Sequence, residues 1–176
     1  MSRRRVLAFA LTASMVVLLD QFTKELVRRS LALGESVPVI DGVLWLTRVR
    51  NTGAAFGLLR GWQWLLVAIA LVVLGAVAWA LVRLKPESGV ARTAFALITG
   101  GAIGNLIDRV VSGGVTDFFD LGWFPVFNVA DIALDVGVAL LIVWLLFGSE
   151  HRSVIDDGTG GVRTSEGGAG DAGVVG

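Results

Sequence analysis

The sequence contains no cysteine and only one histidine, and this scarcity removes several kinds of site. Without cysteine the chain has no disulfide, no thiolate nucleophile and no zinc–cysteine site. The single histidine, His151, follows the last long apolar stretch. A metalloprotease motif of the HExxH type and a Ser-His-Asp triad are therefore excluded from the apolar part of the chain. We expect no metal site and no cofactor.

Charged residues are also scarce, and their charges sum to zero. The 176 residues include 15 basic and 15 acidic side chains, so the net charge is zero and gives no reason to expect a nucleic-acid partner. Hydrophobic residues make up 55% of the chain, and the mean hydropathy is +0.75. Because these residues lie in long blocks, we expect an integral membrane protein.

Four apolar stretches approach the ~20 residues that a membrane-spanning helix needs. They cover residues 6–19, 62–84, 90–106 and 126–147. No small-residue cleavage site follows the first stretch, so its helix is expected to continue past Asp20 as an uncleaved anchor. The sequence therefore predicts an α-helical integral membrane protein with four transmembrane helices.

Basic residues predict how the helices are oriented. The arginines at 3–5 precede the first stretch, and Arg83, Lys85 and Arg92 flank the connection between the second and third, which favours the cytoplasm for both segments. The first connection is also basic but must face outward. A folded outer domain carries less weight in this rule. We expect both termini to be cytoplasmic, with residues 149–176 as a disordered, glycine-rich cytoplasmic tail.

The connection between the first two stretches is predicted to fold on the outer face. Residues 37–40 and 43–49 flank an Asp41-Gly42 turn, a pattern that is typical of a β-hairpin. The apolar face of this hairpin needs a cover, so we expect it to lie on the membrane surface. Residues 34–60 would then form a small extracytoplasmic β region.

Ionisable residues at membrane depth are functional candidates, because a charge in hydrocarbon costs at least a few kcal/mol. Asp20 and Lys24 share a helix face, either as an ion pair that anchors the helix end or as part of a nearby site. Asn105, Asp108 and Arg109 share a face at the end of the third stretch. The Asp108–Arg109 charge cluster would anchor that helix end and orient a neighbouring element.

Small residues mark two other segments. The glycines at 100, 101 and 104 allow another backbone to approach closely, which helix packing alone explains. The run from Asn51 to Phe56 fits either a simple turn or a close backbone approach to a ligand, with the Asn51 amide as a hydrogen-bonding arm.

Asp117 and Asp131 are the strongest candidates for chemistry. Asp117 lies in the short connection after the third stretch, and Asp131 shares a face with Asn128 at the start of the fourth. Because the connection is short, we expect both carboxylates to meet at the outer membrane boundary. Asp131 alone also fits a first-turn acid that the helix dipole favours. Asp120 is a weaker competitor, because its Asp-Leu-Gly setting suits a turn.

A pair of carboxyl groups about 3 Å apart shares one proton, because both cannot ionise cheaply. One group then acts as general base on water and the other as general acid, which suffices for peptide hydrolysis. A Ser112–Lys24 dyad is disfavoured, since Asp20 would keep Lys24 charged. Asp135 lies one turn deeper than Asp131, and it either tunes the pair or binds a neighbouring helix.

Five segments in order resemble the bacterial lipoprotein signal peptidases, the signal peptidase II family. They are DQFTK at 20–24, NTGAAF at 51–56, GGAIGNLIDR at 100–109, VTDF at 115–118 and FNVAD at 127–131. The glycines alone would be unspecific, but the five segments together match over residues 6–148. The resemblance implies a four-helix inner-membrane aspartic peptidase at residues 1–148, with its active site near the outer face.

The resemblance also implies a reaction and its residues. Diacylglyceryl-modified prolipoproteins would be cleaved on the N-terminal side of the lipidated cysteine, with Asp117 and Asp131 as the catalytic pair. The supporting or substrate-binding residues would be Asp20, Lys24, Asn51, Asn105, Asp108, Arg109 and Asn128. We expect a monomer that contacts membrane lipids and is inhibited by globomycin-type compounds. Asp135 lies outside the motif.

Two other functions remain open. A small proton-coupled transporter or channel would use acids as a relay, but such relays usually lie near mid-span at a repeat interface. Here the acids cluster at outer ends and no inverted repeat is visible. A non-enzymatic assembly protein or chaperone would use the outer domain for binding. Replacing Asp117 or Asp131 with asparagine distinguishes a peptidase from these two functions, because a peptidase should then leave the prolipoprotein uncleaved.

Overall fold

The computed structural model describes residues 2–53 and 61–147, which form four helices and a small sheet. The helices are α1 (Arg3–Ser30), α2 (Gln63–Leu84), α3 (Gly89–Ser112) and α4 (Val129–Phe147). The strands are β1 (Ser36–Ile40), β2 (Leu44–Asn51) and β3 (Val115–Asp120). Within the described residues, four helices are long and apolar enough to cross a membrane, which confirms the predicted fold class.

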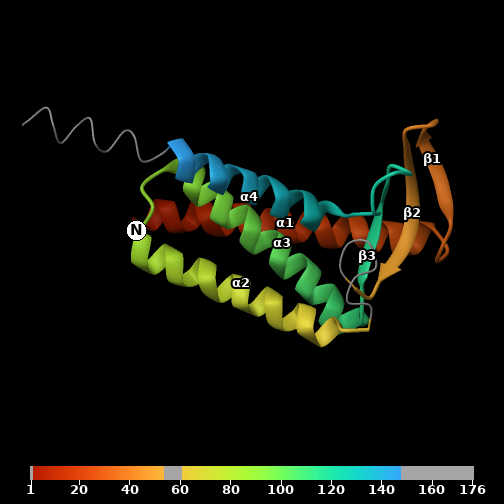
Figure 1. Ribbon diagram of the computed structural model, residues 1–176, viewed down its shortest axis with the longest axis horizontal. Helices are drawn as coiled ribbons and strands as arrows, with labels where there is room; N and C mark the ends of the chain where they lie inside the picture. The colour runs from red at the N-terminus through yellow and green to blue at the C-terminus, as the bar shows by residue number, and fades with distance from the viewer. Residues whose placement is uncertain (1, 54–60, 148–176) are drawn as a thin grey trace, which may run out of the picture.

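Helix α3 is the centre of the bundle and packs against α1, α2 and α4 (Figure 1). In its most apolar window 56% of the residues are buried, against at most 17% in the other helices. The outer helices therefore keep most of their apolar side chains on the surface, where hydrocarbon would cover them.

Three glycines allow α3 to lie close to its neighbours, as predicted. A Cβ atom at Gly100 would lie 2.8 Å from the backbone oxygen of Ala13 on α1. A Cβ atom at Gly101 would lie 2.5 Å from the backbone oxygen of Ala130 on α4, and one at Gly104 would lie 2.6 Å from a carboxylate oxygen of Asp20. Backbone and side-chain atoms of α1 and α4 therefore occupy the space that side chains at these positions would need.

The sheet is antiparallel with the strand order β1-β2-β3. Strands β1 and β2 form the predicted hairpin, and Gly42 in its turn has the positive φ of 74° that glycine adopts most readily. The short connection after α3 also contains a strand, which the sequence did not predict. This strand, β3, pairs with β2 so that Val115 lies opposite Asn51.

Two arginines of β2 fix the sheet to the helix ends. Arg48 donates from Nη1 to the backbone oxygens of Arg28 (3.1 Å) and Leu31 (2.8 Å) at the C-terminus of α1. Arg50 donates from Nη2 to the backbone oxygen of Ser112 at the C-terminus of α3. Cations at helix C-termini satisfy free carbonyl groups and complement the helix dipole. The sheet therefore lies across one end of the bundle.

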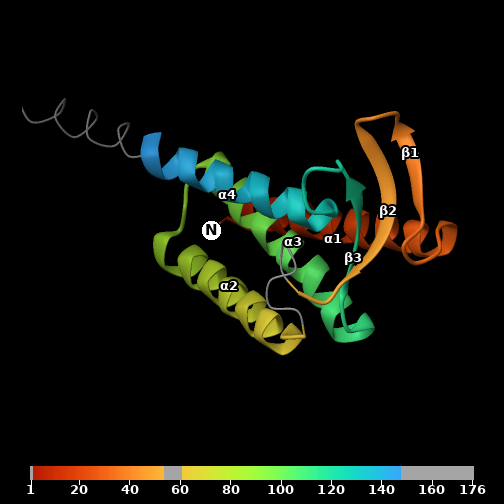
Figure 2. The same cartoon turned by 45° about the vertical axis from the view of Figure 1, so that its right-hand side comes forward.

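The N-terminal end of α1 and the C-terminal end of α4 lie together at the opposite end of the bundle (Figures 1 and 2). The connection between α2 and α3 lies at that end too. This arrangement agrees with the N-terminal end of α1 and the C-terminal end of α4 lying on one side of a membrane. The predicted tail at 149–176 lies outside the described residues.

Candidate active site

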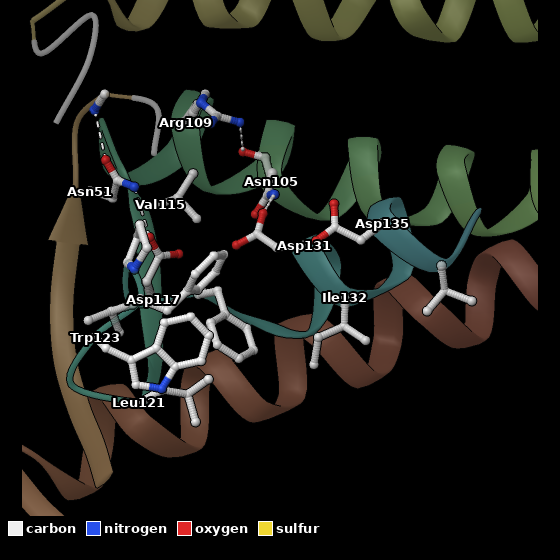
Figure 3. A pocket seen from close by; sticks show the side chains of 16 residues that line it. Asn51, Asn105, Arg109, Val115, Asp117, Leu121, Trp123, Asp131, Ile132 and Asp135 are labelled. Atoms are coloured by element: carbon white, nitrogen blue, oxygen red, sulfur yellow. Dashed lines mark hydrogen bonds between the residues drawn. The ribbon is translucent and has the colours of Figure 1, made fainter. Parts of the chain in front are cut away.

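A cavity of about 580 Å³ lies where β3 and the connection before α4 meet α3 and α4 (Figure 3). Polar groups form part of its wall: Asn51, Asn105, Arg109, Asp117, Asp131 and Asp135. The apolar part includes Leu121, Trp123, Phe124, Val126, Ile132 and Val136. A mainly apolar cavity with a few converging polar groups is the usual form of a ligand site.

Asp117 and Asp131 point toward one another across this cavity (Figure 3). Asp131 lies in the first turn of α4, as predicted. Asp117 does not lie at a helix end; it belongs to β3, and the residue is only 2% exposed. A strand thus supplies one carboxylate and a helix the other.

Two asparagines bridge the aspartates. Asn128 donates from Nδ2 to Asp117 Oδ1 (2.6 Å) and to Asn105 Oδ1 (3.2 Å). Asn105 donates from Nδ2 to Asp131 Oδ1 (2.7 Å). A continuous chain of hydrogen bonds therefore connects the two carboxyl groups and fixes their separation.

Asn128 and Asp131 also form the N-terminal cap of α4. The backbone N–H of Asp131 donates to Asn128 Oδ1 (3.0 Å), and the backbone N–H of Asn128 donates to Asp131 Oδ2 (3.1 Å). This reciprocal pattern is a capping box. Asp131 can therefore stabilise the first turn of α4 and still be a residue of the site.

Asn51 holds the second oxygen of Asp117. Its Nδ2 donates to Asp117 Oδ2 (2.9 Å), while its Oδ1 accepts from the backbone N–H of Gly53 (2.9 Å). The segment thus forms a turn and also brings an amide to the site. Residues 54–56 of this motif lie outside the described residues.

Burial raises the pKa of the Asp117 carboxyl group from 3.8 to about 7. The negative charge of Asp131 acts in the same direction, whereas the hydrogen bonds from Asn51 and Asn128 and the charge of Lys24 oppose it. Asp117 is thus able to hold or release a proton near neutral pH, which is what a general acid or base requires.

Asp20 and Lys24 form a fully buried ion pair with 2.8 Å between Lys24 Nζ and Asp20 Oδ2. The pair does not lie at a helix end, since α1 continues to Ser30. Lys24 donates to Asn105 Oδ1 (2.9 Å), and Asp20 Oδ1 accepts from the backbone N–H of Ala130 (3.0 Å). The pair therefore orients the bridging Asn105 and caps α4.

Asp108 connects three elements. Its Oδ2 accepts from the backbone N–H of Thr116 (2.9 Å), and its Oδ1 accepts from Gln21 Nε2 (3.3 Å) and Arg28 Nη1 (3.5 Å). Gln21, Arg28 and Thr116 were not among the site residues predicted from the sequence. One signal was available for Arg28, which lies one helical turn beyond Lys24 on the same face of α1.

The other charged candidates have different surroundings. Arg109 lines the cavity near both aspartates and donates weakly to the backbone oxygen of Asn105 (3.5 Å). Asp120 accepts from Thr47 Oγ1 (2.7 Å) and the backbone N–H of Gly122 (2.8 Å), as its turn setting predicted. Asp135 is exposed and lines the cavity. Among residues 2–53 and 61–147, no group of three or more His, Cys, Asp or Glu side chains is arranged to hold a metal ion.

The fold and the cavity define a multi-pass membrane protein with two facing aspartates, and comparisons with known proteins give the family. A family model described as signal peptidase (SPase) II matches residues 12–147. The lipoprotein signal peptidase of Geobacillus kaustophilus (strain HTA426) is 49% identical over 145 residues, which cover 80% of this chain and 94% of that protein. The lipoprotein signal peptidase of Geobacter sulfurreducens (strain ATCC 51573 / DSM 12127 / PCA) is 46% identical over 134 residues, covering 72% and 84%. This chain belongs to the signal peptidase II family, which is a family of proteases.

Two solved structures described as bacterial membrane enzymes have the same fold. One, determined by the in meso method at 2.3 Å resolution, has a TM-score of 0.77 and 34% identity, and the match covers 89% of this chain and 94% of that one. The other, at 1.9 Å, has a TM-score of 0.74 and 37% identity, covering 80% and 93%. Both solved structures therefore share the fold of this chain over most of its length.

Proposed function

We propose that this protein is an aspartic endopeptidase that removes the signal peptide from diacylglyceryl-modified prolipoproteins, just N-terminal to the lipidated cysteine. The observation that carries this proposal is the pair of aspartates that face each other in one cavity, bridged by Asn105 and Asn128. Family membership supports the class of substrate.

The arrangement fits hydrolysis by a carboxylate pair that shares one proton. Asp117, whose pKa is about 7, is suited to carry this proton. The ionised partner accepts a proton from water as the water oxygen attacks the scissile carbonyl, and the protonated carboxyl group donates to the carbonyl oxygen. When the tetrahedral intermediate collapses, the C–N bond breaks and the leaving amine takes up a proton from the pair.

The position of the cavity fits a substrate that lies partly in the membrane. The cavity is at the sheet end of the bundle, where β3 meets α3 and α4 (Figure 3). Water for the reaction is available at a membrane boundary and scarce in the hydrocarbon core. Apolar side chains such as Ile132 and Val136 line the same cavity and suit the signal peptide or the acyl chains. We propose that this end faces away from the cytoplasm across the inner membrane.

Cleavage of a lipid-modified prolipoprotein by purified variants tests the proposal. Asp117→Asn and Asp131→Asn should each lose at least ~10³-fold in kcat, since either substitution removes one member of the pair. Asp120→Asn is the matched control, because this neighbouring carboxylate of β3 bonds to Thr47 and Gly122 and does not line the cavity. It should retain cleavage.

Normal cleavage by either folded pair variant would contradict the proposed mechanism. Equal loss in Asp120→Asn would point to a general effect on β3. Globomycin should inhibit the wild-type protein, which provides an independent check of the substrate class. We also propose that the active form of the protein is a monomer.

A further inference from the structure

Arg28 lies in the last turn of α1, close to the site but outside the cavity wall. Its Nη1 donates to Thr116 Oγ1 (3.0 Å) and to Asp108 Oδ1 (3.5 Å), and its Nε contacts Glu25 Oε2 (3.1 Å). Its side chain is 23% exposed, whereas Asp108 is 2% exposed. One guanidinium group therefore links α1, α3 and β3.

Thr116 is held by this cluster at two points. Arg28 donates to its hydroxyl oxygen, and Asp108 Oδ2 accepts from its backbone N–H (2.9 Å). Thr116 is only 7% exposed and directly precedes Asp117 on β3. Because successive side chains of a strand point to opposite faces, a Thr116 side chain fixed toward α1 directs the Asp117 side chain into the cavity.

We propose that Arg28 is a positioning residue for the peptidase reaction: by holding Thr116 and Asp108, it fixes the direction in which β3 presents the Asp117 carboxylate to Asp131. This inference rests on the proposed function. Arg28 touches neither aspartate of the pair in the hydrogen bonds that the described residues form, so its effect passes through the strand.

An arginine is required by the geometry of the cluster. The guanidinium group spreads its donors in a planar fork, so it reaches Glu25 from Nε while Nη1 reaches Thr116 and Asp108. The ammonium group of a lysine is a single point and would reach fewer of these partners. The neighbouring cation Lys24 is already engaged with Asp20 and Asn105.

The chain provides a matched control in the next residue. Arg29 contacts the same glutamate, with 2.6 Å between Nε and Glu25 Oε1, but its side chain is 78% exposed. We expect Arg28→Met to lower kcat about 10-fold with KM changed less than 2-fold, since a displacement of about 1 Å costs up to ~10²-fold in rate. Arg29→Met should leave both constants unchanged. Arg28→Lys should recover part of the lost kcat.

A double-mutant cycle tests whether Arg28 acts through Thr116. Thr116→Val removes the hydroxyl group and keeps the shape of the side chain and the backbone bond to Asp108. If the two residues act together, the double variant should be no slower than the slower single variant. Each kcat is measured per folded protein, with thermal unfolding in detergent recorded for every variant.

Two results would overturn the inference. One is that folded Arg28→Met has the kcat of the wild type. The other is that the total activity of Arg28→Met falls only because less protein is folded, while kcat per folded protein is unchanged. The pair variants separate this failure from that of the proposed function. Active Arg28→Met beside inactive Asp117→Asn removes only the role of Arg28, whereas active Asp117→Asn removes the catalytic pair and with it the reason for positioning.

Discussion

The Asp117 carboxyl group has a pKa of about 7, because burial and the neighbouring charge of Asp131 favour its protonated form. If this group carries the shared proton, kcat/KM should fall as the pH rises through about 7, by up to 10-fold per further pH unit. The measurement is cleavage of a lipid-modified peptide between pH 5 and pH 9, at substrate concentrations far below KM. A rate that stays constant up to pH 9 would contradict the role of Asp117.

The same group should make stability depend on pH. The folded pKa of Asp117 lies above the unfolded value of 3.8, so the folded state binds its proton more tightly. Its contribution to stability is complete below about pH 4 and declines by roughly 1.4 kcal/mol per unit up to pH 7. Asp117→Asn lacks this group, so the wild type should lose stability relative to the variant between pH 5 and pH 8. Thermal unfolding of both proteins at the two pH values provides the comparison, and equal shifts would exclude the effect.

Asp135 shares the cavity with the pair but takes no part in the asparagine bridge within the described residues. It lies four residues beyond Asp131, about 6 Å deeper along α4. We expect Asp135→Asn to retain cleavage and to change its pH dependence, because a nearby negative charge is lost. Initial rates across a pH series measure this. Complete inactivation of the folded variant would place Asp135 within the catalytic machinery.

At the scale of the elements, α3 packs closely against α1 and α4 at three of its glycines, which have no side chain. A methyl group at Gly101 would meet the backbone oxygen of Ala130 at 2.5 Å and Leu134 Cγ at 2.8 Å. Since α4 cannot move without moving Asp131, we expect Gly101→Ala to destabilise the fold by about 1–3 kcal/mol and to slow cleavage. Thermal unfolding in detergent measures the first effect.

Gly75 on α2 provides the control for this substitution. No atom lies within 4 Å of a Cβ added there, so Gly75→Ala should be neutral or stabilising by about 0.5–1 kcal/mol. Equal effects at positions 75 and 101 would mean that helix propensity, and not the contact with α4, determines the result.

Elements differ in how far local sequence predicts them. Long apolar runs predicted the four helices, and Asp41-Gly42 predicted the hairpin, since both signals lie within a few residues. Strand β3 was not predicted, because its partner β2 lies more than 60 residues earlier and no turn signal joins them. The pairing of Asp117 with Asp131 was expected from chain proximity, but the asparagine bridge depends on α1, α3 and α4 meeting at one end.

At the scale of the whole molecule, one end of the bundle contains nearly all the buried polar groups. Asp20 and Lys24 come from α1, Asn105 from α3, Asp117 from β3 and Asn128 from the start of α4. Every buried side-chain nitrogen and oxygen atom in the described part has a hydrogen-bond partner. A network satisfied in this way rigidifies a site, since any unpaired buried group would cost several kcal/mol. The opposite end, which carries the N-terminus, has no buried ionisable residue among those described.

This polarity leads to a prediction about the membrane. If the site end faces outward, a cysteine at Val43 in the hairpin turn should react with a membrane-impermeant maleimide on intact spheroplasts. Cysteines at Ser2 and Glu87, which are exposed at the opposite end, should react only after the membrane is opened. The chain has no native cysteine, so each variant carries one reactive site and the unmodified protein is the blank. Labelling of Ser2→Cys in intact spheroplasts would show that the protein has the opposite orientation. The pair of aspartates could then cleave only at the cytoplasmic surface.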